Sequence, residues 1–186
     1  MNHKLKGEWY TVNGKRLRRW LWWLPAVFMM IVIFWFSSKT GLESDGTSNP
    51  VATAILNLIE CIFGEFDVNQ HELWQEQLNF IVRKAAHMIE YAVLAMMIGL
   101  GCFQNLLRGR WMLLLPFFGS AVYAATDEIH QLFVEGRSGK ITDVFIDSVG
   151  SLIGCLFVFI IVRAVKKKST QSTKQTDCVR NHNNNR

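Results

Sequence analysis

Four blocks of apolar residues, each close to the length of a membrane-spanning helix, constrain the fold more than any other feature of this chain. The blocks are 15 to 19 residues long, whereas a helix needs roughly 17–25 residues to cross a bilayer, so the shorter blocks must borrow flanking residues. Half of the 186 residues are hydrophobic, which is typical of a small membrane protein. The sequence therefore predicts an all-α, multi-pass membrane helical bundle with four transmembrane helices, at about 20–36, 85–103, 111–127 and 143–163.

The distribution of charge divides the chain into three regions and orients it. A basic segment, 1–19, precedes a membrane domain, 20–163, and a polar, Asn-rich tail, 164–186, that we expect to be disordered. If the N-terminus is cytoplasmic, the inner segments hold 15 of the 20 Lys and Arg residues but only two of the 15 acids. The positive-inside rule predicts this asymmetry. We therefore expect both termini in the cytoplasm.

The longest segment between predicted spans, 37–84, is expected to contain a loop and two short interfacial helices. Its first part is rich in Gly, Ser and Asp and includes a Pro, which favour turns and loops. Residues 51–63 and 71–82 then carry apolar side chains at helical spacing, but both stretches are too short to span a bilayer. We expect the first to lie in the interface or cap the bundle, and the second to lead directly into the second span.

Charged and amide side chains gather at the outer ends of the last three predicted spans. An isolated Asp or Arg near the middle of a bilayer costs about 2.5–3.5 kcal/mol or more, so such residues usually face a partner, a cavity or the bundle interior. Lys84, His87 and Tyr91 share one helical face, as do Asp143 and Asp147. The topology therefore predicts one mixed-charge cluster at the outer leaflet, formed by Lys84, His87, Tyr91, Asp127, Glu128, Gln131, Arg137, Asp143 and Asp147.

The composition of this cluster predicts a site for an anion. Two of the predicted spans point their N-termini outward, and the helix dipole favours negative charge there. Arg137 can bind a phosphate or a carboxylate through two parallel hydrogen bonds. His87, Asp127 and Glu128 are candidate acid–base catalysts, because these side chains can move protons at such a group. The candidate ligand-binding residues are Lys84, Tyr91, Gln131, Arg137, Asp143 and Asp147.

Other interpretations of the cluster stay open. It can be a salt-bridge network that holds three helices in register without any ligand. Metal binding is disfavoured, because no H-E-x-x-H or similar pair is present and nearby Lys and Arg compete for the acids, so we expect no metal and no cofactor. Intramembrane carboxylates also occur in proton-coupled transporters, but four spans without an evident inverted repeat argue against that class. No nucleic-acid partner is expected.

The last predicted span carries a small-xxx-small pattern. Gly150 and Gly154 lie on the same helical face as Asp143 and Asp147. Small residues at this spacing let two helices approach closely in a membrane. We therefore expect this face to pack tightly below the charged cluster, and it is a candidate surface for a homo-oligomer.

The residues around the cluster resemble the VanZ-like family of bacterial membrane proteins. The resemblance runs from about residue 36 to 154 and includes the segments FSSKTG, RKAAHMIEYAVL and DEIHQLFVEGRSGKITDVFIDSVGSLIG. One departure is Glu135, where many relatives carry Pro before the Gly-Arg pair of the turn. The family pattern, a D-E-x-x-Q stretch followed by a Gly-Arg turn, an Asp and a Gly-rich helix, is met by Asp127, Glu128, Gln131, Phe133, Gly136, Arg137, Asp143, Gly150 and Gly154.

This resemblance implies a multi-spanning protein of the bacterial cytoplasmic (inner) membrane. The founding member of the family is associated with low-level resistance to the glycopeptide teicoplanin. Our hypothesis is that the protein engages a cell-envelope precursor, such as a lipid-linked peptidoglycan intermediate, at the outer leaflet and lowers susceptibility to glycopeptides. The alternatives are a membrane-embedded enzyme that hydrolyses or transfers a phosphate- or carboxylate-bearing lipid-linked substrate, and a structural membrane protein with a salt-bridge network.

Overall fold

The computed structural model describes residues 18–105, 107 and 109–184, and these residues form helices and no strands. The predicted all-α class is therefore confirmed. In chain order, the elements are the short 3-10 helix η1 (Leu21–Trp23), α2 (Leu24–Ser37), α3 (Gly41–Phe63), α4 (Val68–Gln104), α5 (Trp111–Gln131) and α6 (Ile141–Asn184).

Three of the described helices are long and apolar enough to cross a membrane. They cover Arg18–Ser37, Val68–Gln104 and Ile141–Val165. Helix α5, which coincides with the third predicted span, is not among them, because polar and charged residues fill its last two turns. It nevertheless packs along α4 and α6. The structure thus shows three candidate spans where the sequence predicted four.

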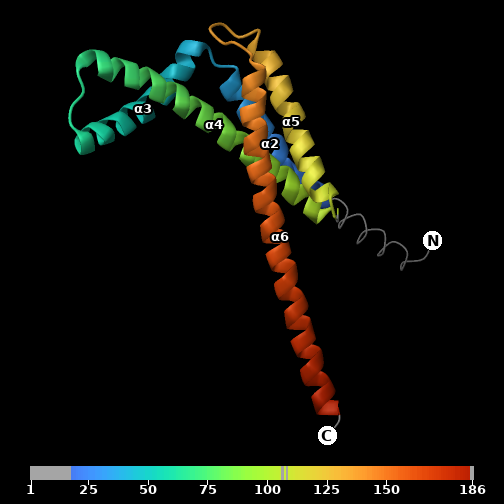
Figure 1. Cartoon of the computed structure of the whole chain (residues 1–186). Helices are drawn as coiled ribbons and strands as arrows, with labels where there is room; N and C mark the ends of the chain where they lie inside the picture. The colour runs from blue at the N-terminus through green and yellow to red at the C-terminus, as the bar shows by residue number, and fades with distance from the viewer. Residues whose placement is uncertain (1–17, 106, 108, 185–186) are drawn as a thin grey trace.

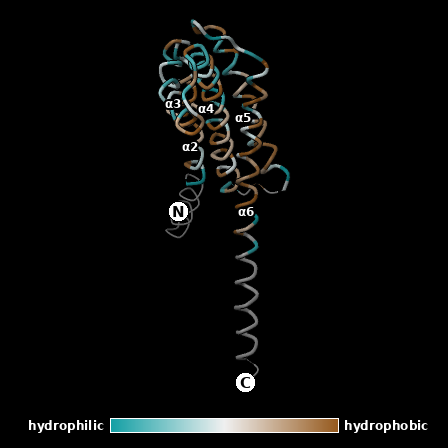
Figure 2. The backbone as a smooth tube through the Cα atoms, turned by 60° about the vertical axis from the view of Figure 1, so that its left-hand side comes forward, coloured by the Kyte–Doolittle hydropathy of each residue, from teal (hydrophilic) through white to brown (hydrophobic). Residues whose placement is uncertain are grey.

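Helix α4 is the centre of the bundle. It contacts α2, α3, α5 and α6, and Figure 1 shows α2, α5 and α6 beside its second half. The core combines residues from three helices: Ala26 and Ile33 of α2, Tyr91 and Leu94 of α4, and Ala124 of α5. The hydrophilic residues collect mainly at the end of the bundle formed by α3 and the loop after α5 (Figure 2).

The small residues of α6 pack against α4 of the same chain. A Cβ added to Gly150 would collide with the carbonyl oxygen of Met88, and one added to Gly154 would collide with that of Ala92. Only glycine allows this approach, because a collision with backbone cannot be relieved by a side-chain rotation. The expectation that the Gly150/Gly154 face supports a homo-oligomer is therefore wrong, since α4 already covers that face.

Helix α3 includes residues that the sequence analysis assigned to a loop. It begins at Gly41, ten residues earlier than expected. The reason is a capping box: the Thr40 hydroxyl accepts a hydrogen bond from the Glu43 backbone N–H (3.3 Å), and the Thr40 N–H donates to the Glu43 carboxylate (3.0 Å). These bonds satisfy donors that a helix start leaves unpaired, and the helix then continues through Pro50.

Helices α3 and the first half of α4 form a hairpin beside the bundle (Figure 1). The second amphipathic stretch runs without a break into the second span, as predicted, within the single helix Val68–Gln104. Polar contacts join the two helices: Glu60 lies 2.8 Å from His71, and the Gln75 amide donates to the Thr53 hydroxyl at 2.8 Å. The interfacial placement of these helices stays a prediction.

Helix α6 extends to Asn184, whereas the tail 164–186 was expected to be disordered. No Gly or Pro follows Gly154 in the sequence. Lys and Gln, which occur repeatedly there, are good helix formers, so nothing in the local sequence stops the helix that begins in the bundle.

Candidate functional site

Most of the predicted cluster comes together where α4, α5 and α6 meet. Lys84 forms an ion pair with Asp143. The Lys140 backbone N–H donates to the Glu128 carboxylate at 2.8 Å, and the Gln131 amide donates to Asp127 at 3.2 Å. A small cavity of about 20 Å³ lies among Arg83, Lys84, His87, Glu128, Gln131, Arg137, Asp143 and Asp147.

This small cavity has almost no free space. A volume of about 20 Å³ accommodates about one water molecule. Its main cation, Lys84, already has an acidic partner in Asp143, and both side chains are largely buried. The cluster therefore joins α4 to α6 through a buried ion pair, and a ligand larger than water does not fit in this small cavity. A polar cavity of about 70 Å³ opens beside it, shares Lys84, Arg137 and Asp143 with it, and has less than a quarter of the volume of the largest cavity described below.

Two predicted site residues lie outside the lining of the small cavity. Tyr91 is fully buried in the apolar core, with its ring 6.4 Å from that of Tyr123. Asp127 is buried and accepts the hydrogen bond from the Gln131 amide. The Tyr91 hydroxyl and one oxygen each of Asp127 and Asp147 have no hydrogen-bond partner among the described residues. No group of three or more His, Cys, Asp or Glu in that part of the chain is placed to hold a metal.

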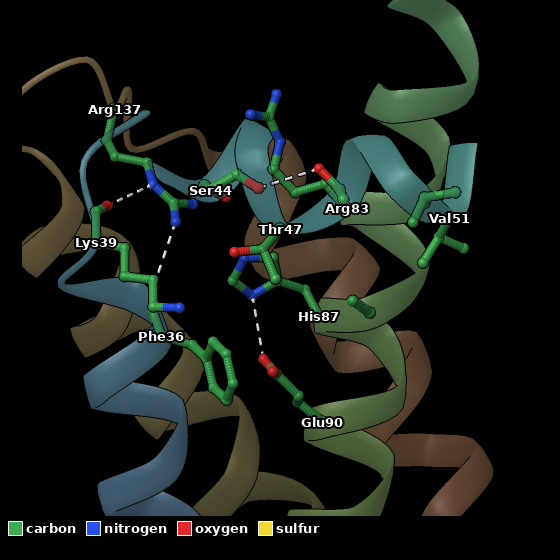
Figure 3. Close-up of a pocket in the computed structure, with 12 residues that line it drawn as sticks. Phe36, Lys39, Ser44, Thr47, Val51, Arg83, His87, Glu90 and Arg137 are labelled. Carbon is green, nitrogen blue, oxygen red and sulfur yellow. Dashed lines mark hydrogen bonds and ion pairs between the residues drawn. The ribbon is translucent and has the colours of Figure 1, made fainter. Parts of the chain in front are cut away.

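A larger cavity, of about 300 Å³, lies beside the cluster and shares Arg83, His87 and Arg137 with it. Residues from α2, α3, α4 and the loop after α5 surround it (Figure 3). Its lining consists of Phe36, Lys39, Ser44, Thr47, Ser48, Val51, Val82, Arg83, Ala86, His87, Glu90 and Arg137. Basic groups, hydroxyls and apolar side chains thus meet in one space.

Arg137 is fixed at this cavity by backbone carbonyls. Its Nε donates to the Lys39 carbonyl oxygen at 3.2 Å and its Nη2 donates to that of Phe36 at 3.3 Å (Figure 3). No acid forms an ion pair with it among the described residues. Burial, and then repulsion from Arg83, lowers the pKa of Arg137, but a guanidinium is basic enough to stay charged.

The turn that carries Arg137 depends on two glycines. Gly136 has φ 72°, a left-handed conformation that side chains disfavour. It lies against Gly41, where a Cβ would collide with the Gly136 carbonyl oxygen. The Gly41 N–H donates to the Glu135 carbonyl oxygen at 3.1 Å. The start of α3 therefore holds the turn in place, and with it the guanidinium.

The other two cations of the cavity differ in their partners. Arg83 is paired with Asp45 of α3 at 2.7 Å. Lys39 places its ammonium 5.2 Å from the Trp35 ring centroid and 4.8 Å from that of Phe36, and it has no acidic partner among the residues described. Arg137 and Lys39 thus give the cavity two cations that form no ion pair with an acid in the described part of the chain, which favours an anion there.

Several residues of the larger cavity were not predicted from the sequence as site residues. Lys39 belongs to the FSSKTG segment, and Glu90 follows His87 by three positions in the RKAAHMIEYAVL segment. Both lie in segments that carry the family resemblance, so their positions could have indicated a role in the site. Ser44, Thr47 and Ser48 were hidden because their stretch was assigned to a loop. Of the proposed catalytic residues only His87 lines the larger cavity, whereas Asp127 and Glu128 do not.

The comparison with known proteins agrees with this architecture. A family model described as VanZ/LLP1 matches residues 22–163, which include every residue that lines the two cavities. No curated protein and no solved structure matches the chain. Since the matched region covers well over half of the sequence, and three of the described helices are long and apolar enough for a membrane, the chain belongs to the VanZ-like family of membrane proteins.

Proposed function

We propose that this VanZ-like protein binds the phosphate or carboxylate headgroup of a cell-envelope amphiphile at the outer leaflet of the bacterial cytoplasmic membrane. The observation that carries the proposal is the cavity of about 300 Å³ with two cations, Lys39 and Arg137, that lack an acidic partner among the described residues. An anion completes their coordination through charge-assisted hydrogen bonds.

The proposed orientation follows from charge and helix order. We place α5 across the membrane as a fourth span, so that both termini are cytoplasmic and the loop after α5 is outside. This arrangement satisfies the positive-inside rule. It puts the cavity at the outer leaflet, where apolar residues such as Phe36 and Val51 in its lining suit the part of an amphiphile next to its headgroup.

A lipid-linked peptidoglycan intermediate is one amphiphile of this class. If the protein binds or shields such a precursor, less of the precursor is accessible to glycopeptide antibiotics, and susceptibility to teicoplanin falls. In this proposal the cluster around Lys84 and Asp143 has a structural role, because Lys84 and Asp143 already neutralise each other in an ion pair. The cluster then fixes α4 and α6, and the neighbouring cavity binds the ligand.

Binding of dioctanoyl phosphatidic acid to the full-length protein in maltoside micelles tests the proposal. Arg137→Gln removes one charge-assisted interaction, worth about 1.5–3 kcal/mol, so the dissociation constant should rise about tenfold or more. Lys140→Gln is the matched control, because it removes the same charge from the same loop but does not line the larger cavity. Equal affinities for wild type, Arg137→Gln and Lys140→Gln would refute the anion site.

A second experiment addresses the cell. A deletion strain carrying wild type, Arg137→Gln or Lys140→Gln would be compared for teicoplanin susceptibility, with membrane levels measured by immunoblot. The proposal predicts protection by wild type and Lys140→Gln and its loss in Arg137→Gln at equal protein levels. Sensitivity unchanged by the wild-type protein would remove the resistance role.

A further inference from the structure

Glu90 is the only acid on the lining of the larger cavity among the residues that the structure describes. Its side chain projects from α4 toward His87, and in this view the His87 ring lies between Glu90 and Arg137 (Figure 3). The other charged lining residues, Lys39, Arg83 and Arg137, are basic. The cavity therefore has two electrostatic sides, and an anion accounts for only one of them.

Glu90 forms no close ion pair with a Lys or Arg among the residues that the structure describes. Its carboxylate is 3.7 Å from His87 Nδ1, which is longer than an ordinary N–H···O hydrogen bond. His87 Nδ1 has no hydrogen-bond partner at all in the described part of the chain, and no Lys or Arg there forms an ion pair with Glu90. A half-buried carboxylate of this kind is costly unless a ligand supplies a donor or a positive charge.

A purely anionic ligand supplies neither a positive charge nor a hydrogen-bond donor to Glu90. It gains attraction from Arg137 and Lys39, but it also brings negative charge toward Glu90, and like charges in a poorly hydrated cavity repel strongly. A ligand that carries an ammonium group a few bonds from its anion satisfies both sides at once.

Building on the anion site proposed above, we infer that the cavity selects a zwitterionic headgroup, in which a phosphate or carboxylate faces Arg137 and Lys39 and an ammonium group faces Glu90. Glu90 is then the residue that sets specificity. Thr47 also lines the cavity, and its hydroxyl oxygen is free to accept a further hydrogen bond while its proton is donated to the Glu43 carbonyl.

The same zwitterion chemistry occurs in a lipid headgroup and in a soluble molecule. Four probes separate the possibilities: dioctanoyl phosphatidylethanolamine, dioctanoyl phosphatidic acid, free phosphoethanolamine and inorganic phosphate. Their dissociation constants would be measured for the full-length protein in maltoside micelles. Preference for the dioctanoyl lipid over free phosphoethanolamine identifies a lipid ligand, and the reverse order identifies a soluble one.

The inference predicts that wild type binds dioctanoyl phosphatidylethanolamine at least several-fold more tightly than dioctanoyl phosphatidic acid. Glu90→Gln should weaken binding of the ethanolamine lipid about tenfold, the loss expected for one charge-assisted interaction, and should leave phosphatidic acid bound as tightly or more tightly. Glu76→Gln is the matched control, because Glu76 lies exposed on the same helix and outside the cavity.

The outcomes separate this inference from the proposal on which it rests. If phosphatidic acid binds in an Arg137-dependent manner but wild type shows no preference for the ethanolamine lipid, the anion site stands and the zwitterion inference is overturned. If none of the four probes binds, both fail. The wild-type preference decides the question even if Glu90→Gln does not fold.

Discussion

Replacing Gly154 by alanine tests the close packing of α6 against α4. A Cβ at this position would collide with the Ala92 carbonyl oxygen, and it would lie 2.9 Å from the carbonyl carbon and 3.1 Å from the Cα of Ala92. These atoms belong to the backbone of α4, so α6 must shift as a whole. Overpacking of this kind costs about 1–3 kcal/mol, against a helix-propensity gain of about 0.5–1 kcal/mol for Gly→Ala. We expect a net destabilisation of about 1–2 kcal/mol.

Gly119→Ala is the matched control for this substitution. Its added Cβ would meet only the Ile98 Cδ1 atom at 3.7 Å, an ordinary van der Waals contact, so the protein should be unchanged or slightly more stable. Unfolding of both variants in mixed micelles, followed by tryptophan fluorescence as the fraction of denaturing detergent rises, measures the difference. If Gly154→Ala is as stable as Gly119→Ala, α4 and α6 do not make the close contact described above.

Three further substitutions or labels test separate parts of the architecture. Lys84→Gln breaks the ion pair and should destabilise the protein by about 3–5 kcal/mol, because it leaves the buried Asp143 carboxylate without its partner. Adding Asp143→Asn removes that unpaired charge and should recover much of the lost stability. Equal stability of the single and double variants would contradict the pairing. Gly136→Ala should cost about 1–2 kcal/mol, since φ is 72° there, as measured by the same unfolding assay, and an unchanged midpoint would show a different turn. Cys61 is exposed on α3, so an impermeant maleimide should label it in intact cells, and labelling only after lysis would reverse the proposed orientation.

The parts of the fold that could be predicted from the sequence are those fixed by periodicity along one helix. Asp143, Asp147, Gly150 and Gly154 share a face because they are separated by three or four residues, and the structure buries all four on the inner side of α6. The spacing of these residues does not specify which helix that face contacts. The same pattern allows close packing against a helix of the same chain or of a second copy, and here it packs against α4.

The cavity could not be predicted because it depends on how α3 begins. The Gly-, Ser- and Asp-rich stretch after Thr40 resembles a loop in composition, but one capping box turns it into a helix. Once helical, it places Ser44 and Thr47 opposite His87 and fixes the turn that carries Arg137. Contacts of this kind join residues almost a hundred positions apart, and a pattern read along one segment does not reveal them.

The central claim is that the anion binds in the cavity beside Lys39 and Arg137 rather than within the ion-paired cluster. The affinity of dioctanoyl phosphatidic acid for Lys39→Gln, compared with that for the charge-neutral pair Lys84→Gln/Asp143→Asn, tests it most directly. Lys39 lines the larger cavity and Lys84 does not. We predict about tenfold weaker binding for Lys39→Gln and wild-type affinity for the double variant. The reverse order would place the ligand in the cluster and contradict the account.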